Sequence, residues 1–95
     1  MKRVSTSDRY SLRLDPSARR GVARLPSRHL LAIAEFIEHA VLVNPWRVGK
    51  PLAGDLDGYL SARIDSYRIV YRIEESAREV HVTRVEHRSN VYRSR

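Results

Sequence analysis

The chain has 95 residues, no cysteine and a formal net charge of +7, with 18 Lys and Arg against 11 Asp and Glu. Such a length supports one domain with a single two-layer core. The lack of cysteine excludes disulfides and thiolate metal sites. The positive charge favours a polyanionic partner, either nucleic acid or an acidic protein segment, although the excess of arginine over lysine is also what a GC-rich genome produces.

The first residues read as a leader, followed by one domain. Residues 1–8 are polar and unpatterned, so we expect a mobile leader before a single domain of residues 9–95. Residues 1–14 lack the apolar region of a secretory signal, and no apolar run approaches the ~20 residues that span a bilayer. We therefore expect a cytoplasmic protein with no membrane contact.

A strand and two helices are predicted next. Alternating apolar residues predict a strand at Tyr10–Leu14. Asp15-Pro16 predicts an N-cap and the first position of a short helix, which stops before Pro26. Ser27 is a cap candidate for a longer helix, which Asn44-Pro45 ends. The apolar stripe of this second helix consists of Leu30, Ile33, Ala34, Ile37, Ala40 and Val41. Its histidines, His29 and His39, are expected on the helix surface.

A loop and three strands complete the pattern. Residues 44–58 are predicted to form a loop that Trp46, Leu52 and Leu56 pin to the core. The strands are predicted at Tyr59–Asp65, Tyr67–Glu74 and Glu79–His87, with a polar turn at Glu75–Arg78. Alternation places Arg63, Arg68 and Arg72 on the face away from the core.

The last predicted strand carries two further expectations. Val80 and Val82 alternate out of phase with Val85, which suggests apolar residues on both faces and a central position. His81 and His87 are six residues apart, so regular alternation places them on one face. The whole pattern predicts an α+β, two-layer fold. In it an N-terminal strand and two helices pack on one face of a mainly antiparallel four-stranded sheet, followed by a short C-terminal helical tail.

Several motifs, in this order and spacing, carry a family resemblance. They are Gly49-Lys50-Pro51-Leu52, then Leu56-Asp57-Gly58-Tyr59, then Ser61-Ala62-Arg63-Ile64, then the segment from Ser66 to Ile73, and finally His87-Arg88-Ser89-Asn90-Val91-Tyr92. Together they resemble the RelE/ParE superfamily of bacterial toxins, from about Tyr10 to Tyr92. A RelE-like member is the toxin of a type II toxin–antitoxin system and a ribosome-dependent mRNA endonuclease. The resemblance implies mRNA on the ribosome as substrate, a cognate antitoxin as partner, and no metal or other cofactor.

The resemblance also assigns the reaction to arginines. Metal-free RNA cleavage uses the 2′-hydroxyl as internal nucleophile, so alignment and charge stabilisation can supply most of the catalysis. Guanidinium groups suit the phosphate because they bond two oxygens at once. Arg68 aligns with the family's catalytic arginine, and Arg88 aligns with the arginine at the end of the last strand. Arg63 is a candidate second clamp, or it forms a cross-strand pair with an acidic residue.

The remaining candidates are a tyrosine, a histidine and two further cations. Tyr92 aligns with the C-terminal tyrosine that stacks on the target nucleotide or deprotonates it, or it is a tail aromatic that closes the core. His87 is a candidate acid or base because imidazole is the side chain best suited to exchange protons near neutral pH, or it is an ordinary surface residue. Lys50 and Arg72 are candidate substrate contacts; Lys50 replaces a cation that is missing near the substrate, or it only decorates the loop.

Two departures from the family keep other functions open. The strand Tyr59–Asp65 lacks the two lysines of RelE, and Lys50 stands where YoeB-type toxins have a catalytic glutamate. The alternatives are therefore a ParE-like poison of DNA gyrase and a partner-binding module with weak or lost catalysis.

Overall fold

A computed structural model describes residues 9–87 of the chain. Its elements, in chain order, are β1 (Ser11–Leu14), α1 (Pro16–Ala23), α2 (Ser27–Phe36) continued by a π-helical turn (Ile37–Val41), α3 (Pro45–Val48), β2 (Lys50–Pro51), a 3-10 turn (Gly54–Leu56), β3 (Leu60–Ile64), β4 (Tyr67–Glu74), a second 3-10 turn (Glu75–Ala77) and β5 (Glu79–His87). The mobile leader and the C-terminal helical tail expected from the sequence lie outside the described residues.

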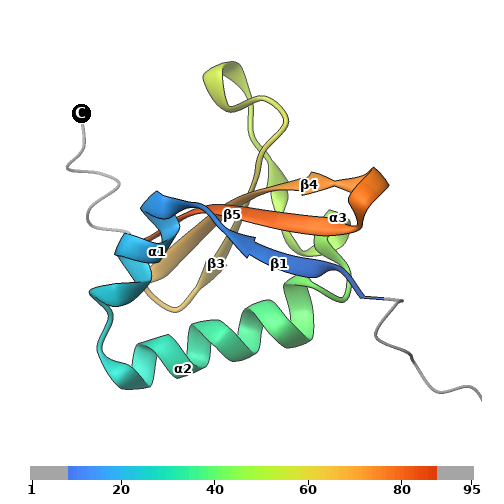
Figure 1. Cartoon of the computed structure of the whole chain (residues 1–95). Coiled ribbons are helices and arrows are strands. Elements are labelled where there is room, and N and C mark those ends of the chain that lie inside the picture. Colours follow the sequence, from blue (N-terminus) through green and yellow to red (C-terminus); the bar gives the residue numbers. More distant parts are fainter. Residues whose placement is uncertain (1–8, 88–95) are drawn as a thin grey trace, which may run out of the picture.

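The described strands form one twisted sheet in the order β1-β5-β4-β3-β2. β1 runs parallel to β5, and the other neighbours are antiparallel. The long helix α2 lies across one face, and the loop between β2 and β3 rises on the other side (Figure 1). The predicted α+β class is confirmed; the two-residue β2 makes the sheet five-stranded instead of four-stranded.

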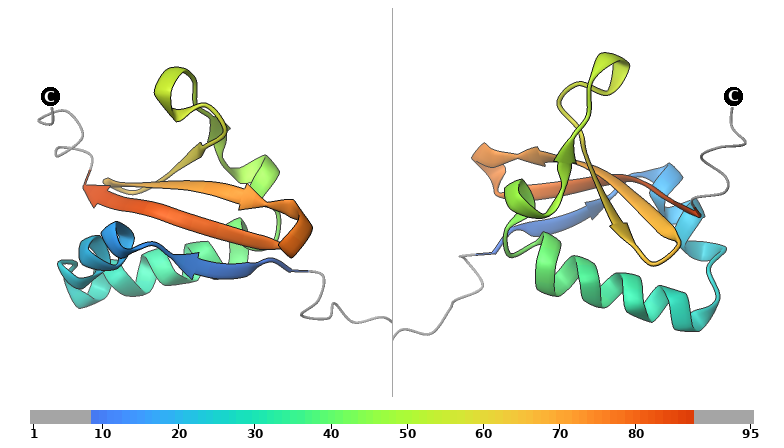
Figure 2. Two further views of the ribbon diagram at one scale, coloured as in Figure 1. Left: turned by 45° about the horizontal axis from the view of Figure 1, so that its top comes forward. Right: turned by 180° about the vertical axis from the view of Figure 1, so that it is seen from behind.

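The first helix, α1, lies against the part of β5 that β1 does not pair with. β1 ends at Leu14, opposite Val82, while β5 continues to His87. Along that remaining edge α1 lies against β5, and Figure 2 shows it beside the end of the strand. A Cβ at Gly21 would lie 2.4 Å from the carbonyl oxygen of Val85, so only glycine allows this approach.

The core lies between the sheet and α2. Its most buried side chains are Tyr71, Ile33, Ile69, Val41, Val80 and Val82. Tyr71 is fully buried and its hydroxyl donates to the carbonyl oxygen of Pro45 at 2.7 Å. Burial raises the pKa of Tyr71 to about 12, which marks it as a structural hydroxyl.

Helix starts and the connecting loop differ from the sequence-based expectations. Asp15 occupies the N-cap position of α1 without a side-chain capping bond, and Ser27 is the first residue of α2 instead of its cap. Pro45 does not merely end a helix; it begins α3, because proline is well tolerated at a first helical position.

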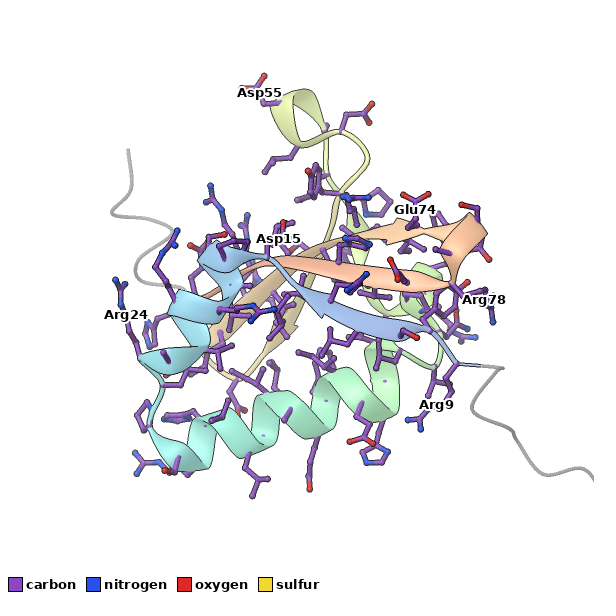
Figure 3. All side chains as sticks on the ribbon, in the orientation of Figure 1. Arg9, Asp15, Arg24, Asp55, Glu74 and Arg78 are labelled. Carbon is purple, nitrogen blue, oxygen red and sulfur yellow. The ribbon has the colours of Figure 1, made fainter. Side chains whose placement is uncertain are left out.

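Trp46 and Leu56 do not anchor the loop in the core: they are 57% and 37% exposed. Asp55 stands at the tip of the loop (Figure 3).

A β-bulge changes how β5 presents its side chains. The register with β4 shifts between Val70 and Tyr71, so that Thr83 is the extra residue of β5. Val80, Val82 and Val85 consequently all point into the core, at 0%, 0% and 4% exposure. The expectation of apolar residues on both faces was wrong, although β5 is central, between β1 and β4.

Candidate functional site

Two of the predicted site arginines are direct neighbours on the open face of the sheet. Arg63 of β3 lies opposite Arg68 of β4 in the antiparallel register. Residues directly opposite each other share a face and have Cβ atoms ~5 Å apart. The alternative that Arg63 pairs with an acidic residue across the strands is therefore wrong.

The next row of the same face contains a lysine. Lys50 pairs with Ser61, Ser61 pairs with Val70, and Val70 pairs with Arg84. Ser61 and Val70 are two residues along their strands from Arg63 and Arg68, so Lys50 shares the face of these two arginines. Gly49, the residue before this lysine, packs closely against Tyr71, because a Cβ at residue 49 would lie 2.4 Å from the Tyr71 hydroxyl oxygen. The candidate site is thus the cationic face formed by Lys50, Arg63, Arg68 and Arg84.

The cations of this face are not engaged in ion pairs within the part of the chain that the structure describes. Within residues 9–87, no ion pair involves Lys50, Arg63, Arg68 or Arg84. In the same part of the chain, Arg68 Nε is the one buried side-chain polar atom without a hydrogen-bond partner. Glu86 lies opposite Arg68 on β5. Three guanidinium groups and one ammonium group share this face with a single carboxylate opposite Arg68, so the face is suited to bind an anion with two or more oxygens.

Arg72, which was predicted to contact the substrate, takes part in a separate network of hydrogen bonds. It is four residues beyond Arg68, or about 13 Å along the strand. Its guanidinium bonds Glu74 at 3.2 Å and His81 Nδ1 at 3.3 Å. His81 Nε2 lies 2.9 Å from Glu79, which Arg13 also contacts at 3.3 Å. The hydrogen bond from His81 is the largest cause that lowers the pKa of Glu79. Arg72 is therefore already engaged by neighbouring side chains.

The histidine predicted as acid or base lies on the other face. His87 pairs with Tyr67, and the two rings meet edge to face with centroids 5.2 Å apart. Tyr67 also contacts the ring of His29 on α2, again at 5.2 Å. The bulge breaks the alternation between His81 and His87, so the expectation that they share a face was wrong. His29 likewise faces the sheet instead of lying only on the helix surface.

A polar cavity at the end of β5 was not foreseen from the sequence. It has a volume of about 690 Å³ and is lined by Arg20 of α1, by Arg24 at its C-cap, and by Arg84, Glu86 and His87 of β5. Figure 3 shows Arg24 at the end of α1. The available signal was the four-residue spacing of Arg20 and Arg24, which puts both on one helix face. Arg88 and Tyr92, the two other predicted catalytic residues, lie outside the described residues.

The described residues contain neither a cluster of metal ligands nor a membrane-spanning helix. Between Arg9 and His87, no three His, Asp or Glu side chains gather as metal ligands would. In the same range, no helix is both long enough and apolar enough to cross a membrane.

Comparison with known proteins assigns the family. The model of a family described as the ParE toxin of the type II toxin–antitoxin system parDE matches residues 12–92. The chain belongs to the RelE/ParE toxin superfamily. Within this superfamily, it is 43% identical to "Toxin RelG" of Mycobacterium tuberculosis over 84 residues, which is 88% of this chain and 97% of the relative. It is 38% identical to "Toxin RelE" of the same organism over 90 residues, covering 95% and 93% of the two chains.

A solved structure extends the RelE/ParE likeness to three dimensions. The toxin–antitoxin complex RelBE2 from Mycobacterium tuberculosis contains a chain that superposes with a TM-score of 0.80 at 42% identity. The match covers 84% of this chain and 99% of that chain. The predicted family and fold are therefore confirmed.

Proposed function

We propose that this toxin is a ribosome-dependent mRNA endonuclease that inhibits translation and is held inactive by a cognate antitoxin. The observation that carries the proposal is the Arg63–Arg68 pair on the open sheet face, where no carboxylate of the described residues pairs with either guanidinium. The relatives named RelE and RelG support the endonuclease class, and the solved RelBE2 complex supports the antitoxin partner.

The proposed reaction is attack by a ribose 2′-hydroxyl on the adjacent phosphorus. The 2′-oxygen–phosphorus bond forms, the phosphorus–5′-oxygen bond breaks, and the products are a 2′,3′-cyclic phosphate and a 5′-hydroxyl. The 2′-hydroxyl gives its proton to a base, and the departing 5′-oxygen takes one up. Arg63 and Arg68 stabilise the two negative charges that build up on the pentavalent phosphorus, since their forks match its equatorial oxygens.

The other cations are assigned to binding. Lys50 and Arg84, one row away, hold the flanking phosphates of the message. Arg88 remains the predicted neutraliser of the leaving group or of the scissile phosphate, and Tyr92 the predicted stacking group or base. The contact of His87 with Tyr67 on the helix side supports giving the base role to Tyr92 in preference to His87. Arg72 is the weaker substrate contact because Glu74 and His81 already engage it.

The test uses ribosomes programmed with a defined message. The wild-type toxin should cut the message in the decoding site and leave a cyclic phosphate at the new 3′ end. Arg68→Gln should lower the single-turnover rate by ~10²–10³-fold, the usual effect of losing one preorganised charge stabiliser. Arg28→Gln, at an exposed position of α2, is the matched control and should cut like the wild type. An intact message at high toxin concentration would refute the proposal.

A second function is favoured by one observation, the match to a family described by its ParE members. ParE-like toxins poison DNA gyrase through protein contacts and need no arginine pair for catalysis. A supercoiling assay with purified gyrase separates the two proposals. Inhibition that survives Arg68→Gln, with no cleavage of message, would favour the gyrase poison.

A further inference from the structure

The polar cavity beside β5 lies where the sheet loses a strand. β1 pairs with β5 only as far as Val82. Within residues 9–87, no strand therefore covers the outer edge of β5 from Thr83 to His87, and this strand edge stays open. The helix α1 lies beside it, as Figure 2 shows. The cavity is thus bounded by a helix on one side and by the end of a strand on the other.

Two close contacts hold α1 in place as a wall of the cavity. Ser17 Oγ donates to the carbonyl oxygen of Thr83, and a Cβ at Gly21 would lie 2.4 Å from a carbonyl oxygen of the same strand. Ser17 and Gly21 are four residues apart, so they lie on one side of the helix. Arg20 and Arg24 each follow one of these two residues by three positions, and both line the cavity. The contacts of the helix therefore fix where the two arginines stand.

The arginines of this cavity form no ion pair within residues 9–87. Arg20, Arg24 and Arg84 are exposed and take part in none of the ion pairs of this range. Three other arginines of the same range each bond a carboxylate at 3.1–3.3 Å. Glu86 supplies the one carboxylate that lines the cavity among the described residues. Three guanidinium groups against one carboxylate leave a positive charge, which favours an anion with several oxygens.

The lining of the cavity fits nucleic acid better than protein. The large apolar side chains that residues 9–87 expose all lie outside it. Its own apolar members, Leu25, Tyr67 and Val85, are partly or fully buried. Interfaces between proteins have an apolar centre, whereas interfaces with nucleic acid are polar and rich in positive charge. A phosphodiester group is therefore the ligand that this lining matches.

Arg84 belongs both to this cavity and to the cationic face. On β5 it lies two residues before Glu86, which pairs with Arg68. Arg84 is therefore a diagonal neighbour of Arg68, with Cα atoms ~7–8 Å apart. An RNA strand whose scissile phosphate lies at the Arg63–Arg68 pair can pass over Arg84 and reach the cavity.

We propose that Arg20, Arg24 and Arg84 form a second phosphodiester-binding site, which holds RNA backbone outside the cleavage centre and takes no part in bond breaking. This proposal rests on the proposed function for RNA as the ligand. Two RNAs present this chemistry to the toxin: the message beyond the cut and the ribosomal RNA beside it. The site raises affinity for the programmed ribosome and leaves the rate of the bound complex unchanged, because its contacts are the same in the ground state and the transition state.

The first test compares two double variants that each lose two exposed arginines. Arg20→Gln with Arg24→Gln removes charges from the cavity, and Arg28→Gln with Arg47→Gln removes them from positions outside it. The cavity variant should bind programmed ribosomes at least ~10-fold more weakly, and its slope of log K against log salt should fall by about 2, one for each lost phosphate contact. The control variant should keep the affinity and slope of the wild type.

The same variants separate binding from chemistry. At saturating concentration the cavity variant should cleave within ~2-fold of the wild-type single-turnover rate, because uniform binding does not change that rate. Arg68→Gln, by contrast, should stay slow at saturation. A cavity variant that binds like the control would overturn the proposal, and so would a saturated rate as low as that of Arg68→Gln.

Two further measurements tell the RNA sources apart without any cleavage. One uses a short 2′-O-methyl RNA oligomer, which has no free 2′-hydroxyl to attack; the other uses ribosomes without message. Weaker binding of the oligomer by the cavity variant assigns the site to the message, and a loss confined to the empty ribosome assigns it to ribosomal RNA. Affinities equal to those of the control for both RNAs would overturn the proposal. A loss confined to polyglutamate, the probe for an acidic protein segment, would overturn it as well.

These binding measurements also keep the proposal separate from the proposed nuclease activity. A toxin that never cuts message but shows either loss of RNA affinity would refute the nuclease and leave this site standing. Cleavage that proceeds while the cavity variant binds both RNAs like the control would do the reverse.

Discussion

Arg63 and Arg68 lie directly opposite each other on antiparallel strands, and no carboxylate of residues 9–87 forms an ion pair with either guanidinium. Like charges in this position destabilise a sheet by a few tenths of a kcal/mol to ~1 kcal/mol. The neighbouring network of Arg13, Glu79 and His81 shows that the same sheet face can neutralise its arginines. The pair therefore opposes stability and favours the binding of an anion, as expected of a functional site.

The first prediction tests whether the Arg63–Arg68 pair destabilises the sheet. Arg63→Glu should raise the free energy of unfolding by about 0.2–1 kcal/mol, because a repulsive cross-strand pair becomes attractive. The same change should lower the cleavage rate on programmed ribosomes by at least ~10²-fold. Denaturant unfolding and single-turnover cleavage measure the two effects. The control is Arg47→Glu, at an exposed position of α3, which should leave cleavage unchanged. A destabilised Arg63→Glu variant would contradict the pairing.

The second prediction concerns salt. Binding to the ribosome–message complex should weaken steeply with salt, since each neutralised phosphate releases counterions. Removing one phosphate contact, with Lys50→Gln or Arg84→Gln, should reduce the slope of log K against log salt by about 1. Titrations between 50 and 200 mM salt, roughly the range over which such slopes are measured, give both values. A slope that neither substitution changes would remove Lys50 and Arg84 from the binding face.

The third prediction uses the single tryptophan as a reporter of pH. Glu75 accepts hydrogen bonds from the Trp46 indole at 2.9 Å and from the Tyr10 hydroxyl at 2.8 Å, and these bonds lower its pKa. A lowered carboxyl pKa contributes stability above the usual value of about 4.3, and this contribution is lost as pH falls through the folded value. Trp46 fluorescence should therefore change with a midpoint below that value. Glu75→Gln should abolish this transition; if it persists, another group causes it.

The fourth prediction tests the close packing of Gly49, the chain neighbour of Lys50, against Tyr71. Gly49→Ala places a Cβ against the fixed Tyr71 hydroxyl, and such overpacking should cost about 1–3 kcal/mol of unfolding free energy. Tyr71→Phe alone should cost ~1 kcal/mol, because the carbonyl oxygen of Pro45 loses its buried partner. The double variant should cost less than the sum, since the clashing oxygen is gone. Additive costs in thermal or denaturant unfolding would show that Gly49 acts through another contact.

The long regular elements followed from local pattern, and the connections did not. β4 and β5 have the predicted bounds, Tyr67–Glu74 and Glu79–His87, because alternating branched and aromatic residues favour strands wherever they are placed. The 44–58 segment was expected to be a core-anchored loop, but Trp46 found its partner in Glu75, 29 residues away. Its glycines and prolines indicate only that regular structure is interrupted.

The candidate site was likewise predicted only in part from the sequence. The sequence pointed to Arg63 and Arg68 as members of one face, and the register confirms that they are neighbours. It could not place His87, because one extra residue at Thr83 reverses every side chain that follows. Nor could it show that Arg20 and Arg24 share a cavity with Arg84, since the close contact at Gly21 depends on tertiary packing.

By itself the amino-acid sequence determined the class of secondary structure, the family and the positive charge of the cationic face. Periodicity and motif spacing are local properties of the chain, so they can be read without the fold. Only the tertiary structure decided which cations lie next to each other, that His87 lies on the face opposite the cationic face, and which strand edge stays open. These outcomes depend on strand register, on a single bulge and on the point at which β1 gives way to α1. Each is set by the packing of residues distant in the chain, which no local pattern encodes.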